Sequence, residues 1–217
     1  MAERIRPYIP AALLLAGWLL TALGYWGAWV WAASAGLRVP GIDLAEYVKF
    51  IAEVRSGEIH LTREVFLLPL IAVSLSMSLL AHRSELRLWP PLRWIINLLA
   101  IPVGLSMLPP AWTPALLATP EFVKQTAAIV VCVLAAILSY PLLRRLPLLF
   151  GAGLTALLAL LSIALPLTSF MKLRSPLEVI YGHPTPLGAG PILLALGLIL
   201  VATAPLLLLR HRSAVNP

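Results

Sequence analysis

Long apolar stretches alternate with short polar segments along the whole chain, and none of the stretches has a charged residue or a histidine in its interior. About 20 helical residues cross the hydrocarbon core of a bilayer, so the stretches are of a length typical of membrane-spanning helices. Six such stretches are present, and the second and third are the shortest. The predicted spans are residues 11–34, 65–81, 94–110, 125–143, 147–170 and 189–209.

The pattern predicts an all-α, polytopic integral membrane protein with about six transmembrane helices. The composition agrees, because 60% of the residues are hydrophobic and only 12% are charged, whereas soluble domains average about 25% charged residues. No polar segment is long enough to form a separate soluble domain. We therefore expect residues 1–217 to form one membrane domain.

Residues 35–64 form the longest polar segment, which the predicted topology places on the outer side. Asp43 stands where a helix N-cap is expected, and Gly57 follows where a helix would end. Apolar residues between them recur at helical spacing: Leu44, Tyr47, Val48, Ile51 and Val54. This spacing predicts a helix at about 44–56 along the outer membrane interface. Its apolar face would pack on the bundle as a lid, or alternatively the helix would dock a partner or gate a cavity.

Positive charge gathers on one side of the predicted topology. The chain has 16 Lys and Arg residues against 9 Asp and Glu residues, a net charge of +7. With a cytoplasmic N-terminus, the inner segments carry all of this excess, because the basic and acidic residues of the outer segments cancel. The positive-inside rule thus predicts cytoplasmic N- and C-termini in the plasma (inner) membrane. The inner arginines, expected to attract anionic lipid and not nucleic acid, are Arg4, Arg6, Arg83, Arg87, Arg93, Arg144, Arg145, Arg210 and Arg212.

Residues that usually carry catalysis or hold cofactors are missing from the spans. His60 and His183 fall in outer segments, and His82 and His211 fall at inner helix ends. No histidine is therefore placed to ligate a haem between helices. The stretch 58–64 contains Glu and His but matches no zinc signature. We predict no catalytic, metal or cofactor-binding residue.

Uncharged polar side chains do occur within the spans. Ser74 and Ser78 share one face of the second span, and Asn97 lies in the third. Such groups commonly form hydrogen bonds between membrane helices. Alternatively, they would line a pocket for a neutral ligand.

These patterns favour a non-catalytic subunit that scaffolds or stabilises a larger membrane complex, with other membrane proteins as its partners. The alternative is a transporter, or a membrane substrate-binding component, for a neutral or apolar solute. Ion coupling is disfavoured because it usually needs a carboxylate inside the membrane. A third class, an enzyme acting on lipid at the outer face, would depend on Asp43, Glu58 and His60.

Overall fold

A computed structural model of the chain describes residues 8–32, 37–109, 111–182 and 184–215. Parts of two predicted spans (residues 33, 34 and 110) lie outside these ranges, as do Arg4, Arg6 and His183. The described chain is mainly helical, as the sequence predicts.

Among the residues that the structure describes, four helical segments are long and apolar enough to cross a membrane. They are α2 (Ile9–Trp26), the segment Arg63–Leu80, α9 (Leu148–Tyr181) and α10 (Gly190–Val215). The segment Arg63–Leu80 consists of a 3₁₀ helix, η4 (Arg63–Leu67), that leads into α5 (Leu68–Leu80). These lengths and compositions support a membrane protein.

Two further apolar helices are shorter than the full width of a bilayer. They are α6 (Pro90–Leu105) and α8 (Val123–Leu138), each of 16 residues. They correspond to the third and fourth predicted spans. The count of six spans therefore remains a prediction, whereas four helices of full spanning length are present.

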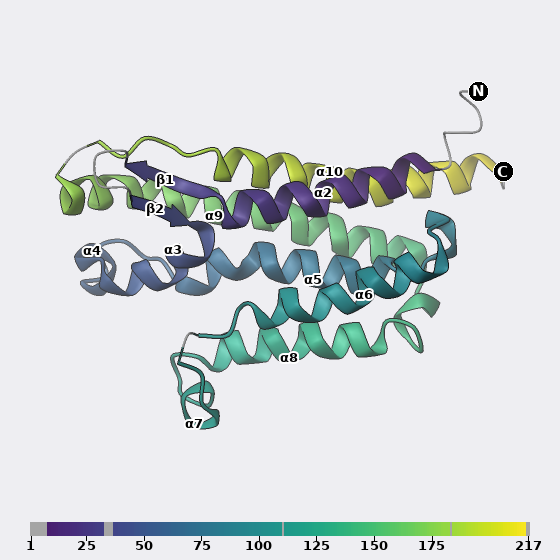
Figure 1. Cartoon of the computed structure of the whole chain (residues 1–217), viewed down its shortest axis with the longest axis horizontal. Coiled ribbons are helices and arrows are strands. Elements are labelled where there is room, and N and C mark those ends of the chain that lie inside the picture. The colour runs from purple at the N-terminus through teal and green to yellow at the C-terminus, as the bar shows by residue number, and fades with distance from the viewer. Residues whose placement is uncertain (1–7, 33–36, 110, 183, 216–217) are drawn as a thin grey trace.

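The helices form layers around α5 (Figure 1). Helices α2 and α10 lie side by side along one side of the bundle, and α9 packs on both α10 and α5. On the opposite side, α6 and α8 pack on each other and on α5. Of the 18 residues in the segment Arg63–Leu80, 72% are buried, whereas 39–44% are buried in 18-residue apolar windows of the other three long helices. We call the α6–α8 pair the edge layer.

The two ends of the bundle differ, and we name them by what they carry. The cap end holds the segments between α2 and α5 and the loop between α6 and α8, with the short helix α7 (Pro114–Leu117). The arginine end holds the α5–α6 turn with η5 (Ser84–Leu86) and the α8–α9 turn with η6 (Leu143–Arg145). The start of α2 and the end of α10 also lie there (Figure 1).

Glycines set the close approach of α2 to α10. A Cβ atom on Gly24 would lie 2.2 Å from the backbone nitrogen of Leu194. Similarly, a Cβ atom on Gly197 would lie 2.4 Å from the backbone nitrogen of Thr21. No side chain fits in these gaps, so the two backbones touch in the way that small residues permit in membrane helices.

The first predicted span, 11–34, is wrong at its C-terminal part. Helix α2 ends at Trp26, and β1 (Ala28–Ala32) then pairs antiparallel with β2 (Leu37–Pro40). Trp29 is fully buried on this hairpin. Its indole packs edge-on against Phe66 and Phe170, with ring centroids 6.2 and 5.3 Å away. In the strand conformation, the large aromatic side chain of Trp29 lies in the core.

The helix predicted at 44–56 is broken. The segment forms α3 (Gly41–Tyr47), a 3₁₀ turn η3 (Val48–Phe50) and α4 (Ala52–Arg55). Ile51 between them is extended, with φ −75° and ψ 123°, and its side chain is buried. The helix also begins after Pro40, so Asp43 lies in its first turn and does not cap it. Gly57 does adopt the left-handed conformation expected of a chain reversal, with φ +82°.

The segment 171–188, which lies between the fifth and sixth predicted spans, is helical over more than half of its length. Helix α9 continues through it without interruption and ends at Tyr181, followed by Gly182 with φ +68°. Its 34 residues span about 51 Å, well beyond the roughly 30 Å of a hydrocarbon core. The second half of α9 thus extends past the other helices at the cap end.

Hydrogen bonds between polar side chains and neighbouring helices join the bundle. Trp18 Nε1 on α2 donates to Ser76 Oγ on α5 at 2.9 Å. Ser74 Oγ on α5 donates to the carbonyl of Ala100 on α6 at 2.8 Å. The core of a bilayer offers no hydrogen-bond partner to a buried donor. These bonds give the indole of Trp18 and the hydroxyl of Ser74 partners within the bundle.

Candidate functional site

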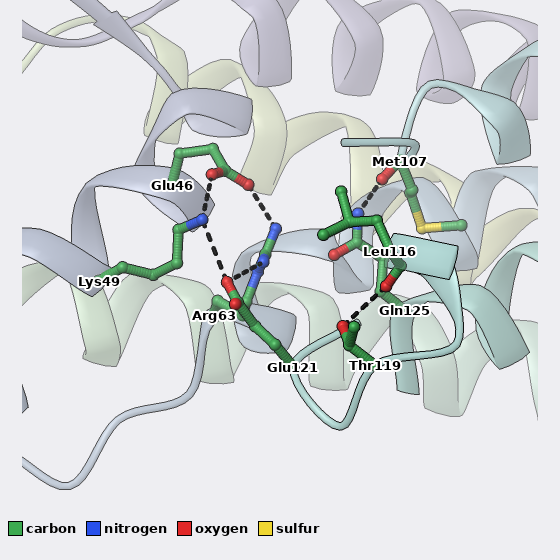
Figure 2. Close-up of polar contacts among 8 residues, drawn as sticks. All are labelled: Glu46, Lys49, Arg63, Met107, Leu116, Thr119, Glu121 and Gln125. Atoms are coloured by element: carbon green, nitrogen blue, oxygen red, sulfur yellow. Dashed lines mark hydrogen bonds and ion pairs between the residues drawn. The ribbon is translucent and has the colours of Figure 1, made fainter. Parts of the chain in front are cut away.

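The most concentrated set of charged contacts lies at the cap end, around Arg63 (Figure 2). Arg63 is the first residue of η4, and its side chain is only 7% exposed. Its Nη2 donates to Glu46 Oε1 on α3, and its Nη1 lies 3.4 Å from Glu121 Oε1. A buried guanidinium needs such partners because a charge without them is costly away from water.

Lys49 completes the cluster. Its Nζ lies 2.6 Å from Glu46 Oε2 and 3.3 Å from Glu121 Oε1. Two cations and two carboxylates thus share one site, and their formal charges cancel. We call Glu46, Lys49, Arg63 and Glu121 the cap cluster.

An aromatic ring packs against both cations of the cap cluster. The ring centroid of Phe122 lies 4.5 Å from Arg63 Cζ and 5.5 Å from Lys49 Nζ. These distances suit cation–π attraction. One nitrogen of the cluster, Arg63 Nε, is buried without a hydrogen-bond partner among the described residues.

The cap cluster joins three segments that are far apart in the sequence. Glu46 comes from α3, Arg63 begins η4, and Glu121 stands just before α8. The loop that presents Glu121 has its own supports: Gln125 Nε2 donates to the carbonyl of Met107, and Thr119 Oγ1 donates to the carbonyl of Leu116 at 2.7 Å (Figure 2). The cluster therefore links the segments between α2 and α5 to the cap end of the edge layer.

Two of the clefts at the cap end are lined in part by the segment that leads into η4. One, of about 390 Å³, lies beside the cap cluster and includes Lys49, Arg55, Arg63 and Glu121 in its lining. The other, of about 580 Å³, lies between α9 and the segment that leads into η4. Its lining includes His60 but none of the cap cluster.

The residues predicted to dock a partner face inward or are partly covered. Leu44, Val48 and Ile51 are buried in the core, with exposed fractions of 0%, 3% and 1%. Tyr47 and Val54 are half-buried and pack against the same core. The apolar face of the segment thus contacts the rest of the chain.

The residues predicted to line a neutral-ligand pocket are all buried and engaged. Ser74 bonds to α6 as described, and Ser78 Oγ donates to the carbonyl of Ser74 at 2.9 Å. Asn97 Nδ2 donates to the carbonyl of Ala136 on α8 at 3.1 Å, which joins the two helices of the edge layer. The amide oxygen Oδ1 of Asn97 is buried without a donor among the described residues.

The carboxylates and histidine of the third hypothesis are not gathered into a metal site. Among the described residues, no group of three His, Cys, Asp or Glu side chains is placed to hold a metal ion. Partial burial, and secondarily the neighbouring Glu46, raise the pKa of Asp43 above its usual range. Glu58 and His60 are exposed.

The sequence reasoning missed both Arg63 and Glu121 as site residues. Their contact spans 58 positions, and no local pattern connects them. The available signal was the equal number of acidic and basic residues in the outer segments, which indicates ion pairing without identifying the partners.

Comparisons with known proteins add no relative. No protein-family model matches the chain, and no curated protein and no solved structure matches it significantly. Function therefore has to be argued from the chain itself.

Proposed function

We propose that this chain is a non-catalytic subunit that stabilises a larger membrane protein complex, and that it crosses the bilayer six times. The observation that carries the proposal is a mismatch in length between the two sides of the bundle. At 16 residues, α6 and α8 are each about 24 Å long, shorter than the roughly 30 Å hydrocarbon core. On the other side, α9 exceeds that thickness.

The edge layer presents a continuous apolar surface. Large side chains on its outward face are about half exposed: Ile95, Leu98, Leu99, Val130, Val131, Leu134 and Ile137. A helix shorter than the bilayer is accommodated by local thinning, by flanking side chains or by association with another protein. If the bilayer thinned to match the edge layer, the longer helices on the other side of this small bundle would no longer match its thickness. A transmembrane helix of a partner subunit along the edge layer removes this conflict.

The polar contacts also support a structural role. The cap cluster is neutral and engaged in internal ion pairs, and the polar groups of α5 and α6 bond to neighbouring helices. No carboxylate lies in the described middle of the bundle, where ion-coupled transport would need one.

The proposed orientation follows from the arginine end. Basic side chains gather there on the two turns, and the positive-inside rule assigns such an end to the cytoplasm. Exposed tryptophans lie near both ends, as interfacial anchors do: Trp26 and Trp31 at the cap end, Trp89 and Trp94 at the other. We therefore propose cytoplasmic N- and C-termini.

Photo-crosslinking in native membranes tests the proposal. A photoreactive phenylalanine analogue is placed at Leu98 or Leu134 on the edge layer, and at Leu160 of α9 or Ile199 of α10 as controls of similar exposure. We expect edge-layer positions to give one discrete heavier adduct with a different membrane protein, and control positions to give none.

A second arm measures stoichiometry. The partner identified by crosslinking should copurify at a fixed ratio in mild detergent, and the double substitution Leu98→Ala with Leu134→Ala should lower that ratio while Leu160→Ala with Ile199→Ala leaves it unchanged. A monomer without a fixed partner would contradict the proposal. So would an adduct formed only between copies of this chain.

A further inference from the structure

The larger of these two clefts at the cap end has a lining that includes no residue of the cap cluster. It measures about 580 Å³ and lies between α9 and the extended segment that leads into η4. Its walls are formed by residues between 54 and 65 on one side and by one face of α9 on the other.

One face of α9 forms a graded wall of this cleft. Leu165, Ser169 and Lys172 follow at helical spacing, so the wall passes from apolar to hydroxyl to cationic toward the cap end. On the facing segment, Val65 is apolar and His60 is polar. The cleft is thus apolar at its inner part and carries hydrogen-bond donors farther out.

The cation of the cleft is not neutralised within the described chain. The ion pairs of the described residues involve Lys49, Arg63 and Arg174, and none includes Lys172. No carboxylate contributes to the lining, although Glu58 and Glu64 flank the facing segment in sequence. The cleft therefore favours an anion.

The length of α9 sets the depth of this cleft in a bilayer. About 20 helical residues cross the hydrocarbon core, so a span that begins at Leu148 leaves it near Leu167. Leu165 then lies at the edge of the hydrocarbon, and Lys172 lies about 8 Å beyond Leu167. Phosphate groups of lipids occupy this depth.

We propose that this cleft binds the phosphate group of an anionic lipid from the leaflet at the cap end. Lys172 supplies the charge, and the hydroxyl of Ser169 supplies a hydrogen-bond donor. Leu165 and Val65 contact the first part of the lipid's apolar chain. The inference rests on the proposed membrane placement and not on the proposed partner, which would bind the opposite side of the bundle.

Native mass spectrometry of the full chain in mild detergent tests the site, with phosphatidylglycerol and phosphatidylcholine as probes. We expect the wild-type protein to retain phosphatidylglycerol over phosphatidylcholine. Lys172→Gln should weaken phosphatidylglycerol retention roughly fivefold, as expected for one basic residue near anionic lipid. The matched control is Lys124→Gln, an exposed lysine at the same end outside the cleft, which should change nothing.

Inorganic phosphate distinguishes a lipid from a soluble ligand. Millimolar phosphate should not displace the lipid, because it has no apolar part to contact Leu165; full displacement would indicate a site for a free anion and overturn the lipid assignment. Equal retention by Lys172→Gln and the wild type, with an unchanged unfolding midpoint for the variant, would overturn the site itself. A failed crosslink at Leu134 bears only on the proposed complex.

Discussion

Two buried arginines at opposite ends of the bundle find their hydrogen-bond partners in opposite ways. At the cap end, Arg63 is 7% exposed and contacts the carboxylates of Glu46 and Glu121. At the arginine end, Arg83 is 4% exposed, and its guanidinium donates to three backbone carbonyls. The charge of Arg63 is neutralised by carboxylates. The charge of Arg83 is stabilised by carbonyl dipoles, which leave its end of the bundle positive.

The carbonyl contacts of Arg83 hold the turn between α8 and α9. Its Nη1 donates to the carbonyl of Leu146 at 2.7 Å, and its Nη2 donates to that of Leu143 at 3.4 Å. Leu143 begins the short η6 turn and Leu146 follows its last residue, and the carbonyl of Leu143 also accepts the N–H of Leu146 at 3.1 Å. One arginine thus fixes a turn and also adds to the positive charge of its end, which an ion pair with a carboxylate would have cancelled.

Replacing Arg83 should have the largest effect. Arg83→Met removes a hydrogen-bond donor from the carbonyls of Leu79 and Leu146, and we expect a loss of about 3 kcal/mol of unfolding free energy. Equilibrium unfolding in detergent measures this loss. Arg145→Met, an exposed arginine on the same turn, should change stability by less than about 0.5 kcal/mol. Equal losses in the two variants would show that Arg83 acts only through its charge.

Replacing Arg63 should cost less, although its charge is paired. Its carboxylate partners are 34% and 52% exposed, so water can solvate them once the guanidinium is gone. We expect Arg63→Met to lose about 1–2 kcal/mol, with Arg55→Met at the same end as the exposed control. The loss should shrink at high salt, because ion pairs are screened. A loss larger than that of Arg83→Met would reverse the comparison.

Acidification should have the smallest effect of the three changes on stability. This effect should arise at the arginine end. Burial, and then the nearby Arg93 and Arg144, lower the pKa of His82 from its usual value of about 6.5. The folded state therefore binds this proton less readily than the unfolded state. Its contribution to stability is complete above about pH 6.5 and declines as the pH falls below that value.

His82→Phe isolates this dependence. His82 packs edge-on against Trp94 and Tyr140, with ring centroids 4.6 and 5.2 Å away, and phenylalanine preserves an aromatic ring there. The thermal midpoint of the variant should fall less between pH 7.5 and pH 5 than that of the wild type. Parallel pH profiles for the two proteins would assign the acid sensitivity to other groups.

The helix bodies could be predicted from the sequence because an apolar run of sufficient length has few alternatives in a membrane. The hairpin could not, because Trp29 and Val30 are as apolar as the helix before them, and hydropathy does not separate a buried strand from a buried helix. Gly27 at the helix end was the one local signal of a change.

The break at Ile51 and the cap cluster depend on contacts between distant segments. No glycine or proline marks the break, which places the Ile51 side chain in the core. The pairing of Arg63 with Glu121 likewise depends on how the α6–α8 loop folds back. Such features follow from tertiary packing and leave no trace in a local pattern.

The glycine contact between α2 and α10 has a consequence for synthesis. Gly24 on α2 contacts the backbone of α10, and Gly197 on α10 contacts the backbone of α2. The two helices lie far apart in the sequence. At about 5–20 residues per second, α2 leaves the ribosome roughly 10–35 s before its glycine face can be covered. The contact between α2 and α10 therefore cannot form until α10 has been synthesised, and the glycine face of α2 has no α10 backbone against it during that interval.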